Sequence, residues 1–379
     1  MTRPAQTGSV NLEGTGRGVK PLEKTTLLCT LAALACACNP DNGPVGPGAA
    51  IRVAADASKA DQPAYGPWGA PVNLGPVVNS AYNDQHPSIS KDGLSLYFVS
   101  NRPGGFGGND IWVSQRATVD DAWGTPQNLG PSINTSSNDF APDLSIDGHH
   151  LYMNSDRPGG CGGSDLYVAR RHDKDDDFGW GQPENLGCAV NTIYDEAGPL
   201  FFEDETSGVQ NLYFTSFNRP GGLGDFDIYV STRSSDDEPW GPGVDVTELN
   251  GPYRDTRTAI RRDGLEMFIS SDATGRPGGV GGQDLWVSRR ATTSDPWSTP
   301  VNLGPTVNSS YFDGAPALSF DGTTLYFFSA RPGGFGANDL YVTTRARLGG
   351  PEVVAEGDAE RHERAEIHGQ RGAHRKGMR

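Results

Sequence analysis

The sequence predicts an all-β protein, a five-bladed β-propeller of four-stranded antiparallel blades. The first observation behind this prediction is a glycine-rich nonapeptide, RPGGFGGND in its first copy, that occurs five times. The copies begin at Arg102, Arg157, Arg219, Arg276 and Arg331, at intervals of 55, 62, 57 and 55 residues. The second observation is that each interval contains the same four short strand patterns and almost no helix pattern. Repeats of this length are typical of propellers, in which four strands make one blade.

The four strands are clearest in the second repeat. Residues 142–146 (PDLSI) form a short apolar strand, and Asp147-Gly148 then predicts a tight hairpin turn. Residues 149–155 (HHLYMNS) alternate and include an aromatic residue, which predicts the second strand. Residues 165–171 (DLYVARR) follow the glycine loop as the third strand, and residues 180–187 (WGQPENLG) make the fourth.

The two ends of the repeat region complement each other. Residues 68–75 (WGAPVNLG) precede the first blade and match a fourth strand, whereas the last unit ends with its third strand, residues 339–345 (DLYVTTR). We expect residues 68–75 to complete the fifth blade and so close the ring, which removes two exposed sheet edges. The propeller is therefore predicted to span residues 65–345.

The repeat PSISKDGLSLYFVSNRPGGFGGNDIWVSQR (87–116) and its four copies resemble the WD-like, TolB-type propeller repeats of bacterial envelope proteins. The resemblance covers about 280 of the 379 residues. It implies the propeller fold and a location in the cell envelope. It does not imply one activity, because propellers host many functions.

The N-terminus predicts an export signal. An apolar run of 11 residues, TTLLCTLAALA (25–35), follows Lys20 and Lys24 and precedes Cys36 and Cys38. The run is too short to span a bilayer and fits the core of a signal peptide. The segment resembles a bacterial lipoprotein signal, which implies lipidation of Cys36 or Cys38, with a plain secretory signal as the alternative. We therefore expect an exported chain, in the outer membrane or periplasm as a lipoprotein, or secreted.

The segments on either side of the predicted propeller have the composition of linkers. We assign residues 1–38 to the signal, residues 39–64 to a flexible Pro, Gly and Ala-rich linker and residues 346–379 to a disordered charged tail. The chain carries a net charge of −16, which argues against nucleic acid as a partner. We expect a monomer that contacts a membrane only through a lipid anchor.

The repeated nonapeptide has three interpretations. A phosphate-binding loop needs a following helix, but here a strand pattern follows. A calcium β-roll needs tandem nonapeptides, but here the copies are far apart. The third interpretation, a hairpin loop in which glycines adopt positive φ, is the one we favour. Arginine and aspartate frame each loop eight residues apart and predict five structural ion pairs: Arg102/Asp110, Arg157/Asp165, Arg219/Asp227, Arg276/Asp284 and Arg331/Asp339.

A second aspartate recurs before the first strand of each repeat. These five residues, predicted to ring one mouth of the channel, are Asp84, Asp139, Asp195, Asp255 and Asp313. Turn-capping is the simpler interpretation of a residue that occurs five times. Departures from the symmetry are more informative, and His86, Glu196 and Arg257 form an asymmetric trio beside this ring. We therefore take the ring and the trio as candidate ligand-binding residues, on the same face as the glycine loops.

Two further motifs concern metals and redox chemistry. The stretch HDKDDDFGWGQPE places Asp173, Asp175, Asp177 and Glu184 like calcium ligands, but it lacks the central glycine of such loops. An acidic surface loop is the favoured interpretation, with no cofactor expected and calcium as the open alternative. Cys161 and Cys188 occur in loops expected on one face of an exported protein, and they predict a disulfide.

Three functions remain open from the sequence. The favoured one is a non-enzymatic binding or scaffold module for a protein or glycan partner in the envelope. The alternatives are a glycan-active hydrolase with carboxylates in the channel, and a multivalent lectin with one site per blade. Hydrolysis of a glycoside needs two carboxyl groups in different roles, whereas most candidate carboxylates here are repeats of one another.

Overall fold

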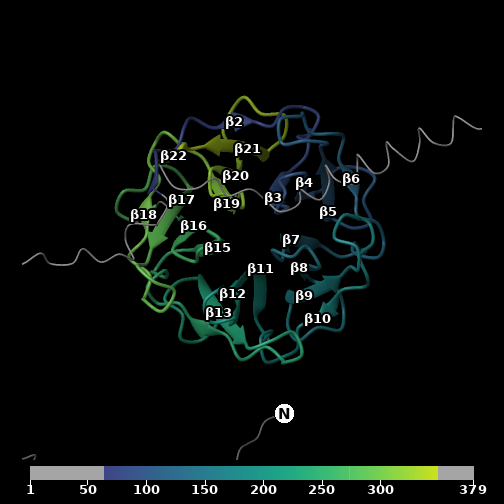
Figure 1. The fold of residues 1–379 in the computed structure, drawn as a ribbon, viewed down its shortest axis with the longest axis vertical. Coiled ribbons are helices and arrows are strands. Elements are labelled where there is room, and N and C mark those ends of the chain that lie inside the picture. Colours follow the sequence, from purple (N-terminus) through teal and green to yellow (C-terminus); the bar gives the residue numbers. More distant parts are fainter. Residues whose placement is uncertain (1–63, 273, 349–379) are drawn as a thin grey trace, which may run out of the picture. The chain divides into compact units, whose positions relative to one another are not determined.

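The computed structural model describes residues 64–272 and 274–348, and it shows five four-stranded antiparallel sheets arranged around a central axis (Figure 1). No helix occurs in these described residues, so none there is long and apolar enough to cross a membrane. The predicted fold class, a five-bladed propeller, is confirmed. The signal segment with Cys36 and Cys38, and almost all of the predicted linker and tail, lie outside the described residues.

Each blade contains three longer strands and a short outer one, in the order of the chain. Blade 1 contains β3 (Asp84–Ile89), β4 (Ser95–Ser100), β5 (Asp110–Gln115) and β6 (Gln127–Asn128). Blade 2 contains β7 (Asp139–Leu144), β8 (His150–Ser155), β9 (Asp165–Arg170) and β10 (Glu184–Asn185). Blade 3 contains β11 (Asp195–Glu203), β12 (Gln210–Phe217), β13 (Phe226–Arg233) and β14 (Val244–Asp245). Blade 4 contains β15 (Asp255–Ile260), β16 (Glu266–Asp272), β17 (Gln283–Arg289) and β18 (Val301–Asn302).

Blade 5 closes the ring with a strand from the other end of the repeat region. It contains β19 (Asp313–Leu318), β20 (Thr324–Ser329), β21 (Asp339–Thr344) and β2 (Val72–Asn73). Val72 lies opposite Val342, and Asn73 lies opposite Tyr341, in antiparallel register. The predicted closure is therefore confirmed. The innermost strands β3, β7, β11, β15 and β19 surround the axis in Figure 1.

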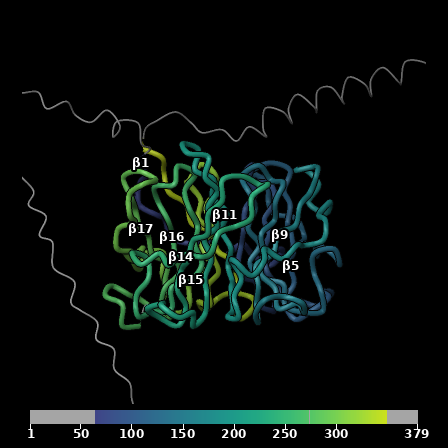
Figure 2. Tube along the Cα trace, turned by 90° about the horizontal axis from the view of Figure 1, so that it is seen from below, coloured from purple at the N-terminus to yellow at the C-terminus, as the bar shows by residue number. Residues whose placement is uncertain are grey.

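A further strand pair extends the ordered chain on both sides of the propeller. Strand β1 (Ala64–Tyr65) pairs with β22 (Arg347–Leu348), residues that the sequence assigns largely to the linker and the tail. Tyr65 Oη also donates a hydrogen bond of 2.8 Å to the carbonyl oxygen of Asp321. The side view in Figure 2 shows β1 at one rim, and this contact identifies that rim as the one that bears the Asp-Gly turns.

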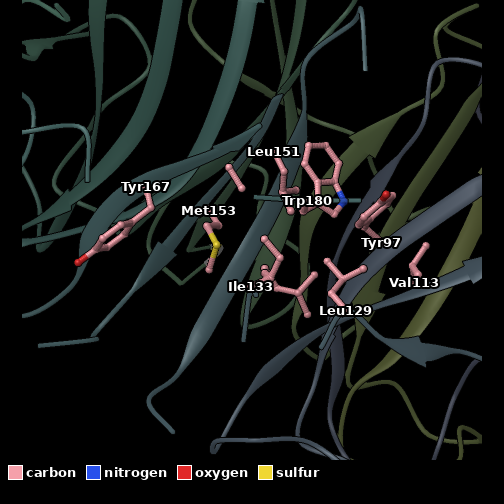
Figure 3. Packing of buried hydrophobic residues seen from close by; sticks show 10 residues of the cluster. Tyr97, Val113, Leu129, Ile133, Leu151, Met153, Tyr167 and Trp180 are labelled. Atoms are coloured by element: carbon pink, nitrogen blue, oxygen red, sulfur yellow. The ribbon is translucent and has the colours of Figure 1, made fainter. Parts of the chain in front are cut away.

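The hydrophobic core is divided into clusters between neighbouring blades. Figure 3 shows one cluster, in which Tyr97 and Val113 of blade 1 pack near Leu151 and Trp180 of blade 2. Burial of such aliphatic and aromatic surface is the main stabilising contribution to a fold of this kind. Because each cluster needs side chains of two blades, the stability of each blade depends on its neighbours.

An arginine–tryptophan pair recurs in every blade, although the sequence-based interpretation did not identify it. The arginine lies at or directly after the end of the third strand, and its guanidinium lies 4.2 to 4.4 Å from the centre of a tryptophan ring that precedes the fourth. The pairs are Arg116/Trp123, Arg171/Trp180, Arg233/Trp240, Arg290/Trp297 and Arg345/Trp68. The fifth pair joins the two ends of the repeat region, so this cation–π contact adds to the closure made by β2.

The glycine-rich nonapeptide is a hairpin loop between the second and third strands, as predicted. In the first copy, Gly104 has a φ of 100°, in the region that favours glycine. A Cβ atom on Gly107 would lie 1.9 Å from the carbonyl oxygen of Ser137 in the loop before blade 2. Glycine is therefore required once for the turn and once for the close approach of the next blade.

The predicted ion pairs are wrong in their partners. Arg102 bonds Asp84 at 2.5 Å instead of Asp110, and the arginines of blades 2, 4 and 5 pair in the same way. Arg219 of blade 3 donates instead to the carbonyl oxygen of Gly243. The pairs found are Arg102/Asp84, Arg157/Asp139, Arg276/Asp255 and Arg331/Asp313. The carboxylates that the sequence paired with arginine point into their own loops, where they accept backbone N–H groups: Asp110, Asp165, Asp227, Asp284 and Asp339.

Replacing Arg102 by alanine is expected to lower the free energy of unfolding by about 3 kcal/mol, because it leaves Asp84, a fully buried carboxylate, without its cation. Chemical unfolding of the Arg102→Ala, Asp84→Ala and Asp110→Ala variants and of the two double variants measures this. We expect a coupling energy between Arg102 and Asp84, and near-additive effects for Arg102 and Asp110. A coupling energy between Arg102 and Asp110, with additive effects for Arg102 and Asp84, would instead support the pairing predicted from the sequence.

The predicted disulfide between Cys161 and Cys188 is present. Their Cα atoms lie 5.6 Å apart, and the bond closes a loop with a sequence separation of 27. It joins the glycine loop of blade 2 to the segment that leads into blade 3. Disulfides persist in oxidising compartments, so this bond is consistent with the expected export.

Reduction of this disulfide is expected to lower the free energy of unfolding by about 3 kcal/mol, the entropy that a loop of this length loses when it is closed. The Cys161→Ser/Cys188→Ser double variant should unfold at the same lower temperature with or without reductant. The unmodified protein should shift only when reductant is added. Labelling of both thiols in native, unreduced protein would contradict the bond.

Candidate functional site

Two cavities lie along the axis of the propeller. One, of about 440 Å³, is lined by the later part of the innermost strands and by turns that lead to the second strands, such as Ser145–Asp147 and Ser319–Phe320. The other, of about 320 Å³, is lined by the first residues of the innermost strands, among them Gln85 and Thr256. Because the glycine loops lie beside those first residues, the larger cavity opens on the opposite face. The prediction of a site on the glycine-loop face therefore overlooked the larger cavity.

A ring of left-handed residues separates the two cavities. Each innermost strand is irregular at one point, where φ lies between 49° and 61°. The residues at this point are His86, Ala141, Gly198, Arg257 and Ala315. A positive φ is unfavourable for residues other than glycine, above all for large ones. His86 and Arg257 are the two large members, and both line both cavities.

The predicted aspartate ring has a structural role in four of the five blades. Asp84 accepts hydrogen bonds from the backbone and hydroxyl of Ser80, at 2.5 and 2.8 Å, in addition to its pairing with Arg102. Asp139, Asp255 and Asp313 occupy equivalent positions, and all four carboxylates are buried. They line neither cavity. The turn-capping interpretation is thus the correct one for these residues.

In blade 3 the capping role belongs to Glu196 and not to its neighbour Asp195. Glu196 lies opposite Ser216, as Asp84 lies opposite Ser100, and its carboxylate accepts the backbone and hydroxyl protons of Thr192 at 2.8 and 2.6 Å. Asp195 is exposed instead. Glu196 therefore caps its own loop and is not part of an asymmetric ligand site. Glu196 stands 11 residues after Asn185, the offset at which Asp84 follows Asn73, so the choice of the neighbouring aspartate displaced the predicted ring by one position.

His86 and Arg257 remain as candidates. The His86 ring contacts Phe140 and Phe328 edge to face, at 5.8 and 5.5 Å between ring centres. Burial, together with the charge of Arg257, lowers the pKa of His86 well below its usual range, so the ring is neutral at pH 7. Among the described residues, its Nδ1 atom has no hydrogen-bond partner.

Asp143 is the functional candidate that the sequence-based interpretation missed. It lines the larger cavity from β7, and its Oδ2 atom accepts a hydrogen bond of 2.8 Å from the backbone amide of Phe201. Burial raises the pKa of Asp143 to about 7, although the Phe201 hydrogen bond opposes this shift. The carboxyl group is thus close to half protonated at neutral pH, which suits proton transfer. The signal in the sequence was a single acid at a position where other repeats carry Ser88, Leu200, Ala259 and Ala317.

Other carboxylates line the same cavity in a different state. Asp147 is partly buried, which raises its pKa, but hydrogen bonds from His150, Ser145 and the backbone of His149 hold that pKa well below its usual range. His150 lies 3.9 Å from both Asp147 and Asp236. Glu203 is exposed on the same wall, and Glu205 pairs with Arg262 at 2.9 Å. The cavity therefore combines Asp143, whose pKa is raised, with Asp147, whose pKa is lowered.

In the acidic stretch that resembles a calcium loop, Asp177 and Glu184 form ion pairs with arginines. Asp177 is buried and pairs with Arg171 at 2.8 Å, and it accepts hydrogen bonds from Ser95 and Tyr97 of blade 1. Glu184 pairs with Arg170 at 2.6 Å. In the part of the chain that the structure describes, no group of three or more potential ligands gathers around one point. The stretch therefore joins two blades through Asp177.

Comparison with known proteins gives structural neighbours only. No family model matches the sequence, and no curated protein is similar to it. An α-L-arabinofuranosidase from Lactobacillus brevis is 16% identical, with a TM-score of 0.50 over 74% of this chain and 98% of that chain. A thermostable family-43 glycoside hydrolase is 14% identical, with a TM-score of 0.49 over 74% and 94%. An α-L-arabinofuranosidase from Podospora anserina, solved with cellotriose, is 15% identical, with a TM-score of 0.46 over 76% and 97%.

These comparisons correct two interpretations of the sequence. The Lactobacillus brevis neighbour is a glycoside hydrolase, so the preference for a non-enzymatic binding or scaffold module is corrected in favour of the alternative, a glycan-active hydrolase. Of the resemblance to WD-like repeats, the five-bladed fold is confirmed, whereas no comparison supports the TolB-type family or a lipoprotein. At these identities the likeness establishes the fold alone, so any argument for catalysis rests on the cavity.

Proposed function

We propose that this protein is a glycan-active hydrolase whose substrate enters the cavity on the face of the Asp-Gly turns. The observation that carries the proposal is Asp143, a carboxylic acid in the cavity wall with a pKa raised to about 7 by burial. A general acid that protonates the leaving oxygen of a glycoside needs a raised pKa of this kind. The cavity, at about 440 Å³, is of the size that holds a small oligosaccharide segment.

A purely structural role explains Asp143 less well. Its hydrogen bond to Phe201 joins β7 to β11, but the equivalent positions of the other blades carry serine, leucine or alanine. Blades can therefore join at this point without a carboxylate. A buried acid that packing does not require is more typical of a functional group than of a structural one.

Hydrolysis needs a second carboxyl group, which stays ionised. Asp147 and Glu203 line the same cavity, and hydrogen bonds keep the pKa of Asp147 low. We assign the acid role to Asp143 and the ionised role to one of these two. This pairing answers the objection from the sequence, because the carboxylates concerned are not repeats of one another.

The position of the larger cavity favours one ligand-binding site on the axis over five equivalent sites, one per blade. A lectin with one site per blade would need equivalent cavities, whereas this cavity lies on the axis and its polar lining comes mostly from blades 2 and 3. Export of the chain remains a proposal, which the disulfide between Cys161 and Cys188 supports.

The test is a hydrolysis screen with the purified full-length chain at pH 5 to 8. The substrates are arabino-, xylo-, gluco- and galacto-oligosaccharides, the matching aryl glycosides and their uronic-acid counterparts, and sugar release is followed by chromatography. We expect release from at least one class, at a rate above that of protein carrying Asp143→Asn. An equal rate from both proteins, or release from none of the substrates, would overturn the proposal.

A further inference from the structure

Arg257 carries its charge into the channel without a carboxylate partner. Among the described residues, its guanidinium makes no hydrogen bond or ion pair, and its backbone amide donates to Thr215 Oγ1 at 3.3 Å. The other arginines around the channel are occupied: Arg262 pairs with Glu205 at 2.9 Å, and Arg254 lies over the Phe226 ring at 4.4 Å. A cation inside a protein is nearly always paired, so an unpaired one needs an explanation.

The backbone around Arg257 is arranged to admit its side chain. Arg257 has a φ of 49°, a conformation that is unfavourable for a long side chain. Gly198 lies beside it on blade 3, and a Cβ atom there would be 2.7 Å from Arg257 Cδ. The blade 3 member of the ring of left-handed residues thus has no side chain where the arginine passes. The guanidinium occupies the boundary between the two cavities.

Burial and the charge of Arg254 lower the pKa of Arg257 to about 9, so the guanidinium remains charged at pH 7. His86 lines the same boundary, and its buried Nδ1 atom has no hydrogen-bond partner among the described residues. The net charge of the chain, −16, opposes anions in general. An anionic group of a ligand would therefore be attracted only at this boundary, by the charge of Arg257.

We propose that Arg257 binds the carboxylate of a uronic-acid residue in the glycan that enters the larger cavity. This inference rests on the proposed function and names its substrate class. A guanidinium offers two parallel N–H donors that match a planar carboxylate better than any neutral sugar hydroxyl. The anion supplies the partner that Arg257 lacks in the protein.

A filling role for Arg257 predicts a different result. If Arg257 served only to fill the boundary, its removal would leave a void and lower the melting temperature. Removal of an unpaired, partly desolvated cation leaves stability unchanged or raises it. The Arg257→Ala variant, which removes the side chain beyond Cβ and places alanine where Ala141 and Ala315 stand in other blades, should therefore melt at or above the temperature of the unmodified protein.

The binding test uses calorimetric titration of the full-length chain carrying Asp143→Asn, which prevents turnover. The probes are glucuronic-acid-substituted xylotriose against xylotriose, trigalacturonate against galactotriose, and a sulfated galactose oligosaccharide. We expect at least one uronate to bind at least tenfold more tightly than its neutral match. Adding Arg257→Gln should weaken that probe by tenfold to a hundredfold, the range for loss of a charge-assisted hydrogen bond. The matched control, Arg170→Gln, at an exposed ion pair with Glu184 outside both cavities, should stay within about twofold.

The results separate the inference from the proposed function. Equal binding of acidic and neutral probes, stronger binding of the sulfated sugar, or full affinity after Arg257→Gln would each overturn the assignment of a uronate. Hydrolysis of a neutral glycan that is insensitive to Arg257→Gln would do the same and leave the hydrolase proposal intact. Uronate binding that depends on Arg257 without any turnover would support the inference and contradict the hydrolase.

Discussion

Deletion of residues 68–75 is expected to lower the melting temperature by more than 15 °C or to prevent folding. The deletion removes β2 and leaves the backbone groups of β21 exposed along a sheet edge. It also removes Trp68, whose ring lies 4.4 Å from the Arg345 guanidinium, and Leu74, which packs against a core cluster between blades 1 and 5. Loss of one strand therefore weakens two blade interfaces as well as one blade.

The matched control deletes residues 56–63, the same number of residues, immediately before β1. Thermal unfolding followed by circular dichroism should show no change for the control and the large decrease for the closure deletion. The deleted protein should also aggregate, because its exposed edge can pair with another copy. Similar melting temperatures for the two deletions would show that β2 does not close the ring.

Replacement of Asp143 by asparagine is expected to reduce kcat by about a hundredfold to ten-thousandfold on any glycan that the protein hydrolyses. This is the range over which a positioned general acid accelerates such a reaction. Asparagine keeps the shape of the side chain but carries no acidic proton. The control is Asp121→Asn, at an exposed carboxylate that accepts only the backbone and hydroxyl protons of Thr118. Equal losses in both variants would indicate damage to the fold, which circular dichroism would reveal.

The pH dependence offers a second measurement on the same residue. With a pKa of about 7, the acid form of Asp143 is lost as the pH rises through 7, and hydrolysis should fall in that range. The pKa of Asp143 is raised in the folded protein, so its protonated form favours folding. The stabilisation is present below pH 4 and is lost as the pH rises to about 7. The melting temperature of Asp143→Asn should therefore rise relative to the unmodified protein over that interval, and a constant difference would contradict the raised pKa.

The repeat and its two ends were sufficient to predict the fold. Strand patterns with glycine turns are local properties of the chain, and residues 68–75 matched a fourth strand that only the fifth blade lacked. The disulfide between Cys161 and Cys188 could also be predicted. Each cysteine replaces the residue that other repeats carry at its position, and both loops lie on one face of the propeller. The hairpin role of the nonapeptide followed from the strand after it.

The side-chain partners were not predictable, because more than one carboxylate recurs in each repeat. Arg102 stands a fixed eight residues from Asp110, yet it pairs with Asp84, which lies across the hairpin on a neighbouring strand. The spacing from the arginine to that aspartate is 18 residues in blades 1, 2 and 5 and 21 in blade 4, whereas the spacing of eight is constant and directed the prediction to the other aspartate. Glu196 was misassigned because a glutamate takes the place of the aspartate in blade 3, while Asp195 stands directly before it.

By itself, the sequence determined the number of blades, the closure and the disulfide, since these depend on repeats and on loops that local patterns define. Only the tertiary structure defined the site that we propose. Asp143 looks ordinary in the chain, and its pKa rises only because five innermost strands bury it beside the axis. Arg257 looks like one more cation, and only the packing of blade 4 against Gly198 of blade 3 leaves its charge facing a cavity without a partner. Burial and the absence of a partner are properties of the assembled ring, and no single repeat contains them.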